Sequence, residues 1–223
     1  MSDLLGLVIA YIMILSAIAI AGLLLRKRVF SPTLSRKFIH ISVSNWWLIA
    51  MHFHTRALYA AVGPLTFIAF NWIAYRRHLL AAMEDPEHRR NLGTVYFPIS
   101  LLVLVLLCYN GSIPLYVGGI GVLVMGYGDG LASVIGNRWG QIRIRLFDGN
   151  KSVLGSAAMF VASAAVVLLF MLRFQPAASP STLLAASVTT AAIATLIELL
   201  TPLGLDNITV PIGTTAFFYL VFA

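Results

Sequence analysis

The chain has 223 residues, of which 60% are hydrophobic and only 10% are charged, and its formal net charge is +7. This balance excludes an ordinary water-soluble domain, in which about a quarter of the residues are charged. Since a bilayer span takes ~20 apolar residues, the length allows about seven or eight spans with short loops. We therefore predict an all-α, polytopic membrane protein of seven or eight transmembrane helices, with residues 1–223 in a single domain. The lone cysteine, Cys108, excludes an internal disulfide and a cysteine metal cluster.

Apolar runs interrupted by charged residues, glycine or proline predict the membrane spans. In chain order they cover residues 4–25, 38–53, 57–75, 94–110, 114–135, 152–172, 182–200 and 208–223. The first run has no basic segment before it, so we expect an uncleaved span rather than a signal peptide. The second and last runs are short, and either one is also compatible with a tilted or re-entrant segment.

The distribution of charge predicts the orientation in the membrane. If Arg26, Lys27 and Arg28 lie in the cytoplasm, every lysine and arginine except Arg56 and Arg173 falls on the cytoplasmic side. We therefore place the N-terminus outside and the active-site loops in the cytoplasm. The membrane topology and the attraction of basic residues to anionic lipid head groups then account for the positive net charge, so no nucleic acid partner is needed to explain it. The acidic residues that fall on the cytoplasmic side are Glu84, Asp85, Glu87, Asp129, Asp148, Glu198 and Asp206.

A basic cluster stands at the start of the second span. Arg36 and His40 are four residues apart, so on a helix they share a face, and Lys37 lies beside them. This arrangement favours phosphate binding. The alternative is a topological anchor whose cations reach lipid phosphates.

Asp129 lies within the fifth span, in the glycine-rich segment 126–130. An ionisable side chain at the centre of a membrane helix costs ~2.5–3.5 kcal/mol, so Asp129 needs a partner. The flanking Gly128 and Gly130 permit close backbone approach or a break in the helix. The partner is either a Mg²⁺ ion carried by a nucleotide phosphate or a salt bridge to Arg36 or Lys151.

The segment that leads into the sixth span and opens it contains Asn150, Lys151, Ser152 and Gly155. A lysine, hydroxyl groups and the free N–H groups of a helix start suit phosphate. The alternative is a helix N-cap next to an interfacial lysine. The spacing of a P-loop is absent from this segment, so analogy with soluble nucleotidases does not apply.

The last cluster joins Glu198, near the end of the seventh span, to Asp206 and Asn207. Two carboxylates and an amide can complete a metal shell or orient an attacking hydroxyl. In the alternative, Asp206 or Asn207 only caps the last helix.

Taken in order, these clusters resemble the CTP-dependent polyprenol kinase family, which includes dolichol kinases, phytol kinases and a diacylglycerol kinase branch. The matching residues are Arg36-Lys37-x-x-His40, Leu92-Gly93-Thr94, Gly128-Asp129-Gly130-x-Ala132-x3-Gly136, Lys151-Ser152-x2-Gly155-Ser156, and Glu198 followed by Asp206-Asn207-x3-Pro211. Many members carry an acid immediately before the glycine of the Lys-Ser/Thr motif, where this chain has Leu154. The forms of the first and fourth motifs are most similar to phytol kinases and their bacterial relatives.

The resemblance implies transfer of the γ-phosphoryl group of CTP to the hydroxyl of a membrane isoprenoid alcohol of the phytol, geranylgeraniol or polyprenol type. It implies that Asp129, Lys151, Glu198 and Asp206 are catalytic and that Asp129 and Asp206 hold Mg²⁺. The implied nucleotide- and phosphate-binding residues are Arg36, Lys37, His40, Gly128, Gly130, Asn150, Ser152, Gly155 and Asn207. CTP follows from the family alone, because no spacing in the sequence selects cytosine over adenine.

Two other functions fit the sequence. The first is a membrane phosphatidate cytidylyltransferase, which makes a CDP-lipid from CTP. The second is a small transporter in which Asp129 and Glu198 are buried coupling carboxylates. A transporter predicts polar residues spread across the bilayer, whereas these clusters gather at one side.

Overall fold

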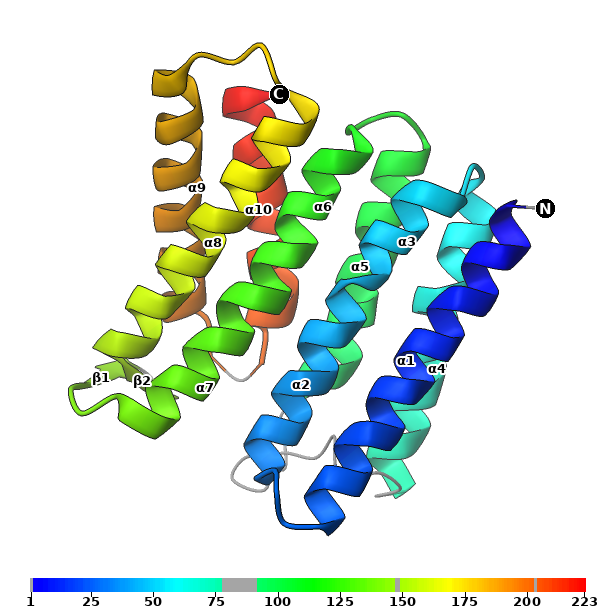
Figure 1. Ribbon diagram of the computed structural model, residues 1–223, viewed down its shortest axis with the longest axis vertical. Coiled ribbons are helices and arrows are strands. Elements are labelled where there is room, and N and C mark those ends of the chain that lie inside the picture. The colour runs from blue at the N-terminus through cyan, green and yellow to red at the C-terminus, as the bar shows by residue number, and fades with distance from the viewer. Residues whose placement is uncertain (1, 78–91, 147–148, 203) are drawn as a thin grey trace.

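The computed structural model describes residues 2–77, 92–146, 149–202 and 204–223, and most of these residues are helical (Figure 1). The helical elements are α1 (Ser2–Arg26), α2 (Pro32–Ser44), α3 (Trp46–Phe53), α4 (Ala57–Arg77), α5 (Gly93–Tyr109), α6 (Leu115–Leu123), the π-helical turn η1 (Val124–Asp129), α7 (Gly130–Trp139), α8 (Val153–Phe174), α9 (Pro180–Leu200) and α10 (Asp206–Phe222). The acidic residues Glu84, Asp85, Glu87 and Asp148 lie outside the described residues. The prediction of a helical fold is confirmed.

Five segments of the described chain are long and apolar enough to cross a membrane: α1, α4, the continuous stretch Leu115–Trp139, α8 and α9. Each of the other predicted runs also lies on helix. The run 38–53 lies on α2 and α3, and the other two lie on α5 and α10, which have 17 residues each. Large apolar side chains such as Ile12, Val161 and Leu184 point outward and are more than half exposed. Such an apolar outer surface is what lipid requires of a spanning helix.

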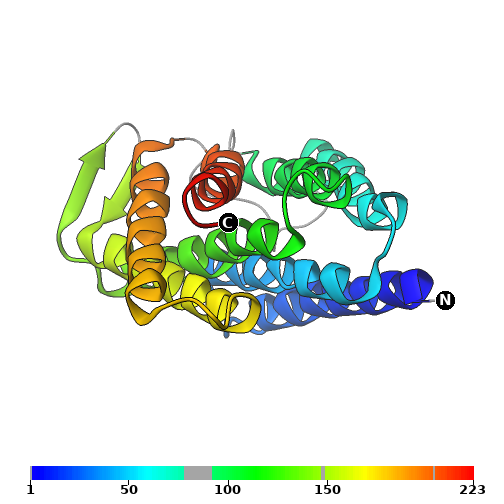
Figure 2. The same ribbon diagram turned by 90° about the horizontal axis from the view of Figure 1, so that it is seen from above.

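The helices run roughly along one direction, so the molecule has two ends (Figure 1). We call them the lower end, where α1 ends and α8 begins, and the upper end, where α1 begins and α8 ends. Seen from above, α1, α2 and α3 lie along one side, and α4, α5 and α10 lie along the other (Figure 2). Serine caps start two of the helices: Ser31 accepts a hydrogen bond from Leu34 N, and Ser179 accepts one from Thr182 N. A proline follows each cap at the first helical position, which its fixed φ favours.

The predicted second span is divided at Asn45, between α2 and α3. Asn45 donates from its side chain to the carbonyl oxygen of Ile41, 2.8 Å away. Trp46 and Trp47 follow and are among the largest fully buried side chains of the core. They lie T-shaped to each other, with ring centroids 6.2 Å apart. The break therefore precedes two large anchors near the middle of the molecule.

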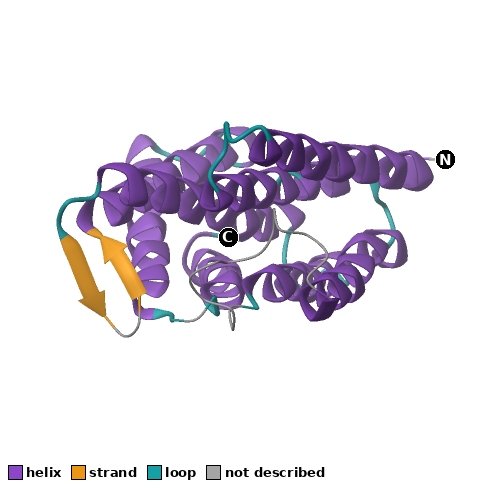
Figure 3. Ribbon diagram, turned by 90° about the horizontal axis from the view of Figure 1, so that it is seen from below, coloured by secondary structure: helices purple, strands orange, loops and turns teal. Residues whose placement is uncertain are grey.

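A short hairpin interrupts the helical pattern at the lower end, between α7 and α8 (Figure 3). Strands β1 (Arg143–Leu146) and β2 (Gly149–Ser152) pair antiparallel, with Arg143 opposite Ser152 and Leu146 opposite Gly149. The purely helical prediction did not include it. The hairpin delivers Lys151 and Ser152 to the first turn of α8.

Candidate active site

Asp129 is the last residue of the π-helical turn η1, and its side chain is buried, with the residue 5% exposed. A π-helical turn carries one more residue per hydrogen-bonded ring than an α-helix and often marks a functional site. Of the two alternatives that the glycines offered, the structure has close packing rather than a helix break, since the chain stays helical and widens. A Cβ on Gly128 would lie 2.4 Å from Met159 Sδ, and one on Gly130 would lie 2.5 Å from the side chain of Ile41. These glycines let α8 and α2 pack closely on either side of the turn.

The ion pair that Asp129 makes comes from α2. Lys37 Nζ donates to Asp129 Oδ2 over 2.5 Å, and His40 Nε2 lies 3.7 Å from the same oxygen. The sequence had offered Arg36 or Lys151 as the salt-bridge partner, and that prediction is wrong. Helical periodicity explains the difference, because adjacent residues of α2 point about 100° apart and Lys37 is the one that faces Asp129.

Lys151 pairs with Glu198 at the lower ends of α8 and α9. Its Nζ lies 2.8 Å from Glu198 Oε1 and also donates to the backbone carbonyl of Glu198. Ser152 is the N-cap of α8, and its Oγ accepts from Gly155 N over 3.1 Å. The N-cap alternative is therefore confirmed for Ser152, whereas its role toward phosphate stays a prediction. The side chain of Asn150 lies outside the described residues.

Asp206 is the first residue of α10, and the N-cap position belongs to Leu205, which makes no side-chain cap. The prediction that Asp206 or Asn207 caps this helix is therefore wrong. Instead, Asp206 Oδ1 accepts from the backbone N and the side-chain Nδ2 of Asn207, both at 2.9 Å. The Asn207 amide thus holds the carboxylate in place and leaves its other oxygen for the cavity.

The three carboxylates of Asp129, Glu198 and Asp206 converge, with one oxygen of each lying within 4.8 Å of the others. At an effective dielectric constant of about 20, two carboxylates at that separation repel by about 3.5 kcal/mol. Lys37 and Lys151 offset part of this repulsion. Closely spaced carboxylate oxygens are the ligands that Mg²⁺ prefers, so these residues fit the predicted ion.

These groups line one cavity of about 420 Å³ at the lower end. Of the predicted site residues, it collects Arg36, Lys37, Asp129, Lys151, Ser152, Gly155, Glu198 and Asp206. His40 and Asn207 line an adjoining cavity, and Gly128 and Gly130, on either side of Asp129 in the chain, are buried. The sequence prediction missed Thr33, Ser133 and Arg143, which also line the cavity. Ser133 follows Asp129 by four residues, so helical spacing was a usable signal for it.

Fold and site together define a class: a helical membrane protein with a buried cavity of carboxylates and cations at one end. The chain is 31% identical over 201 residues to a phytol kinase of Synechocystis, covering 90% of this chain and 84% of that protein. It is 29% identical over 217 residues to a probable chloroplastic phytol kinase of Triticum aestivum, covering 89% and 71%. It is 27% identical over 175 residues to the dolichol kinase of Saccharomyces cerevisiae, covering 72% of this chain and 32% of that protein.

The chain belongs to the phytol kinase and dolichol kinase family, and its relatives mark it as a lipid-alcohol kinase. No protein-family model matches the chain, and no solved structure does.

Proposed function

We propose that this protein transfers the γ-phosphoryl group of CTP to the hydroxyl of a membrane isoprenoid alcohol of the phytol, geranylgeraniol or polyprenol type. One observation carries the proposal beyond the family. The charged cavity adjoins an apolar cavity of about 180 Å³, and Arg36, Lys37 and Asp206 line both. A water-soluble nucleotide and a lipid-dissolved alcohol can therefore meet at this junction. CTP is the donor that the resemblance to the polyprenol kinase family implies.

In this proposal the cations of the site bind the phosphates. Arg36, Lys37 and Lys151 all line the charged cavity. Both lysines are held by carboxylates, Lys37 by Asp129 and Lys151 by Glu198. An ammonium group on a flexible stem can turn from a carboxylate to a phosphate over a short distance. The ion pairs thus keep the lysines at the site while it is empty of substrate.

Asp129, Glu198 and Asp206 would hold Mg²⁺, which supplies charge neutralisation of the phosphate oxygens when it is bound. Asp206 has a second role, because it alone among the three carboxylates lines both cavities. We assign to it the orientation of the alcohol and acceptance of its proton. The alcohol oxygen then forms a bond to the γ-phosphorus, and the bond from that phosphorus to the β–γ bridging oxygen breaks. The products are an alkyl phosphate and CDP.

The site is proposed to face the cytoplasm, with the N-terminus outside and seven or eight spans. Support comes from the positions of the basic residues in the described chain. Arg26, Lys27 and Arg28 follow or end α1 at the lower end, whereas Arg56 and Arg173 stand next to the upper ends of α4 and α8. An excess of lysine and arginine marks the cytoplasmic side of a membrane protein.

The test is a transfer assay with purified protein in detergent and Mg²⁺. CTP labelled at the γ-phosphate is supplied in parallel with phytol, geranylgeraniol, a long polyprenol and diacylglycerol. We expect label in an organic-soluble monophosphate made from an isoprenoid alcohol. Labelled cytidine in the lipid product would instead support the cytidylyltransferase. Folded protein that transfers label to none of these lipids would overturn the proposal.

A further inference from the structure

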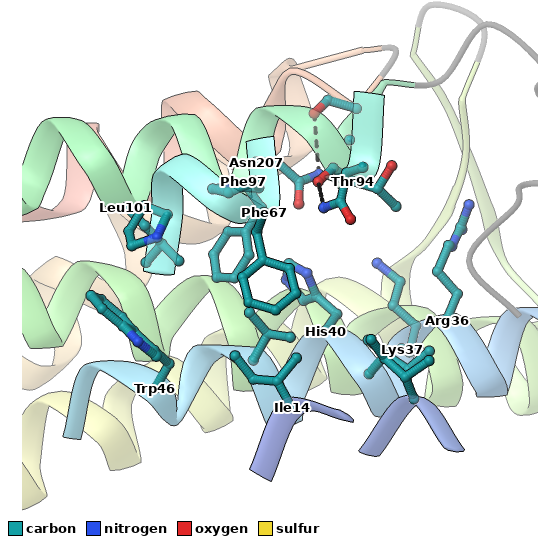
Figure 4. Close-up of a pocket in the computed structure, with 18 of the residues that line it drawn as sticks. Ile14, Arg36, Lys37, His40, Trp46, Phe67, Thr94, Phe97, Leu101 and Asn207 are labelled. Carbon is teal, nitrogen blue, oxygen red and sulfur yellow. Dashed lines mark hydrogen bonds between the residues drawn. The ribbon is translucent and has the colours of Figure 1, made fainter. Parts of the chain in front are cut away.

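The apolar cavity is lined by α1 and α2 on one side and by α4 and α5 on the other (Figure 4). We call it the tail groove. Figure 4 shows Arg36 and Lys37 at one end of it and Trp46 at the opposite end, with Phe67 and Phe97 between them. The groove is therefore charged at its mouth and apolar beyond it.

The lining residues form successive levels from the mouth to the far end. His40, Thr94 and Asn207 lie nearer the mouth, Phe67 and Phe97 lie further in, and Trp46 and Leu101 lie at the far end (Figure 4). Lys37 and Trp46 are nine residues apart, which at the rise of a helix is about 14 Å. The hydrocarbon core of a bilayer is ~30 Å thick, so the groove ends near its middle.

Trp46 closes the far end. It is 2% exposed, and a Cβ on Gly63 would lie 2.9 Å from its Nε1. On the mouth side of Gly63, Tyr11 of α1 bonds to Thr66 and stacks on Phe67 of α4, so α1 and α4 are in contact beside the groove. In the described part of the chain nothing accepts a hydrogen bond from Trp46 Nε1. The indole closes this end of the groove by packing against Gly63.

Two buried polar atoms at the mouth have no hydrogen-bond partner among the described residues: His40 Nε2 and Asn71 Oδ1. Buried polar atoms are nearly always paired, so such atoms point to a missing ligand. A hydroxyl can donate to one group and accept from another, which suits this pair of atoms. Both residues line the tail groove.

The occupant that fits is a single apolar chain with one polar head. The mouth supplies cations for a phosphorylated head, and the walls beyond it are aliphatic and aromatic. One groove with one closed end takes one tail, whereas a glycerolipid has two.

We infer that the tail groove holds the first part of the isoprenoid tail of the alcohol, and that Trp46 sets the tail length that the enzyme accepts. This inference rests on the proposed function and names the specificity-determining residue of the same site. An alcohol longer than the groove must bend out between the helices at Trp46 or bind less deeply.

The test compares three variants by kcat/KM for farnesol, geranylgeraniol and a long polyprenol. Trp46→Leu deepens the groove, and Leu101→Phe shortens it at the same level. Trp47→Leu is the matched control, because Trp47 is 1% exposed and packs away from the groove against Gly118 and Gly119 of α6. One methylene in an apolar pocket changes discrimination between substrates by about tenfold or more. We therefore expect the long-to-short ratio, which is kcat/KM for the long polyprenol divided by kcat/KM for farnesol, to rise about tenfold in Trp46→Leu. It should fall by a similar factor in Leu101→Phe and stay unchanged in Trp47→Leu.

A ratio that moves no further in Trp46→Leu than in Trp47→Leu would overturn the inference while leaving the kinase proposal intact. Binding is measured separately as the rise in melting temperature that geranylgeraniol produces without nucleotide. We expect Leu101→Phe to lose most of that rise. An equal rise with diacylglycerol would assign the groove to chains of bilayer lipid and overturn the inference as well. Absence of transfer to every alcohol by the wild-type protein would refute the proposed function instead.

Discussion

Replacing Asp129 with asparagine separates the catalytic role of this carboxylate from its role in stability. The substitution keeps the shape of the side chain and removes its charge. The lost attraction to Lys37 Nζ, at 2.5 Å, amounts to about 7 kcal/mol at an effective dielectric constant of about 20. The same change removes repulsion from Glu198 and Asp206, about 3.5 kcal/mol each at 4.8 Å. These contributions nearly cancel, so we expect the stability of Asp129→Asn to stay within about 2 kcal/mol of the wild type.

Lys37→Met should behave differently, because it removes the attraction without relieving any repulsion. Taking one partner from a buried ion pair costs about 3–5 kcal/mol. The cost should fall on adding Mg²⁺, since a divalent cation at the three carboxylates replaces the missing positive charge. Melting temperatures in detergent, with and without Mg²⁺, measure both effects.

Asp129→Asn is expected to lose activity although its stability stays close to that of the wild type. Loss of one preorganised charge at a phosphoryl-transfer site lowers the rate by about 10²–10³. The matched control is Asp3→Asn at the upper end, where the carboxylate accepts from Thr55 N over 2.8 Å and lies in neither cavity. That variant should keep its transfer rate. The reasoning is refuted if Asp129→Asn transfers phosphate within tenfold of the wild type, or if Lys37→Met melts no lower than Asp129→Asn.

The remaining predictions concern Lys151, Gly155 and the orientation in the membrane. Lys151→Met should raise KM for CTP at least about tenfold in the transfer assay, whereas Arg173→Met at the upper end should not. Gly155→Ala should cost about 1–3 kcal/mol in denaturation experiments, because its Cβ would lie 2.9 Å from the carbonyl oxygen of Ala132. The orientation is tested by maleimide labelling of two single-cysteine substitutions, Lys27→Cys and Ala177→Cys, made in separate proteins. The native Cys108 is buried and should not react. The cysteine at position 27 should be labelled only from the cytoplasmic side, and the cysteine at position 177 only from the outside.

The sequence predicted the helices well because their signal is local. A run of apolar residues long enough for a bilayer must be helical, since lipid offers no partner for backbone N–H and C=O groups. The run 182–200 thus lies on Pro180–Leu200, and the run 57–75 lies on Ala57–Arg77. The break at Asn45 and the π-helical turn at Asp129 leave hydropathy unchanged, so the apolar runs carried no sign of them.

Convergence of Asp129, Glu198 and Asp206 could be anticipated from topology, because the predicted spans place all three residues toward the same side of the membrane. The choice of Lys37 over Arg36 as the partner of Asp129 could not. That choice depends on the rotation of α2 about its own axis, and adjacent helical residues point about 100° apart. Sequence order fixes neither that rotation nor the position of the hairpin that carries Lys151.

The position of Lys37, which lines both cavities, affects which molecules can pass from one cavity to the other. Lys37 stands at the mouth of the tail groove and is paired with Asp129 in the charged cavity. An uncharged alcohol passes such a cation at little cost, whereas a phosphate monoester carries about two negative charges at neutral pH and is strongly disfavoured in apolar surroundings. In the proposed reaction the product head group is therefore held at Arg36 and Lys37 while its tail still occupies the groove. Release then requires the tail to leave toward the bilayer, so a deeper groove should slow product release as well as admit longer alcohols.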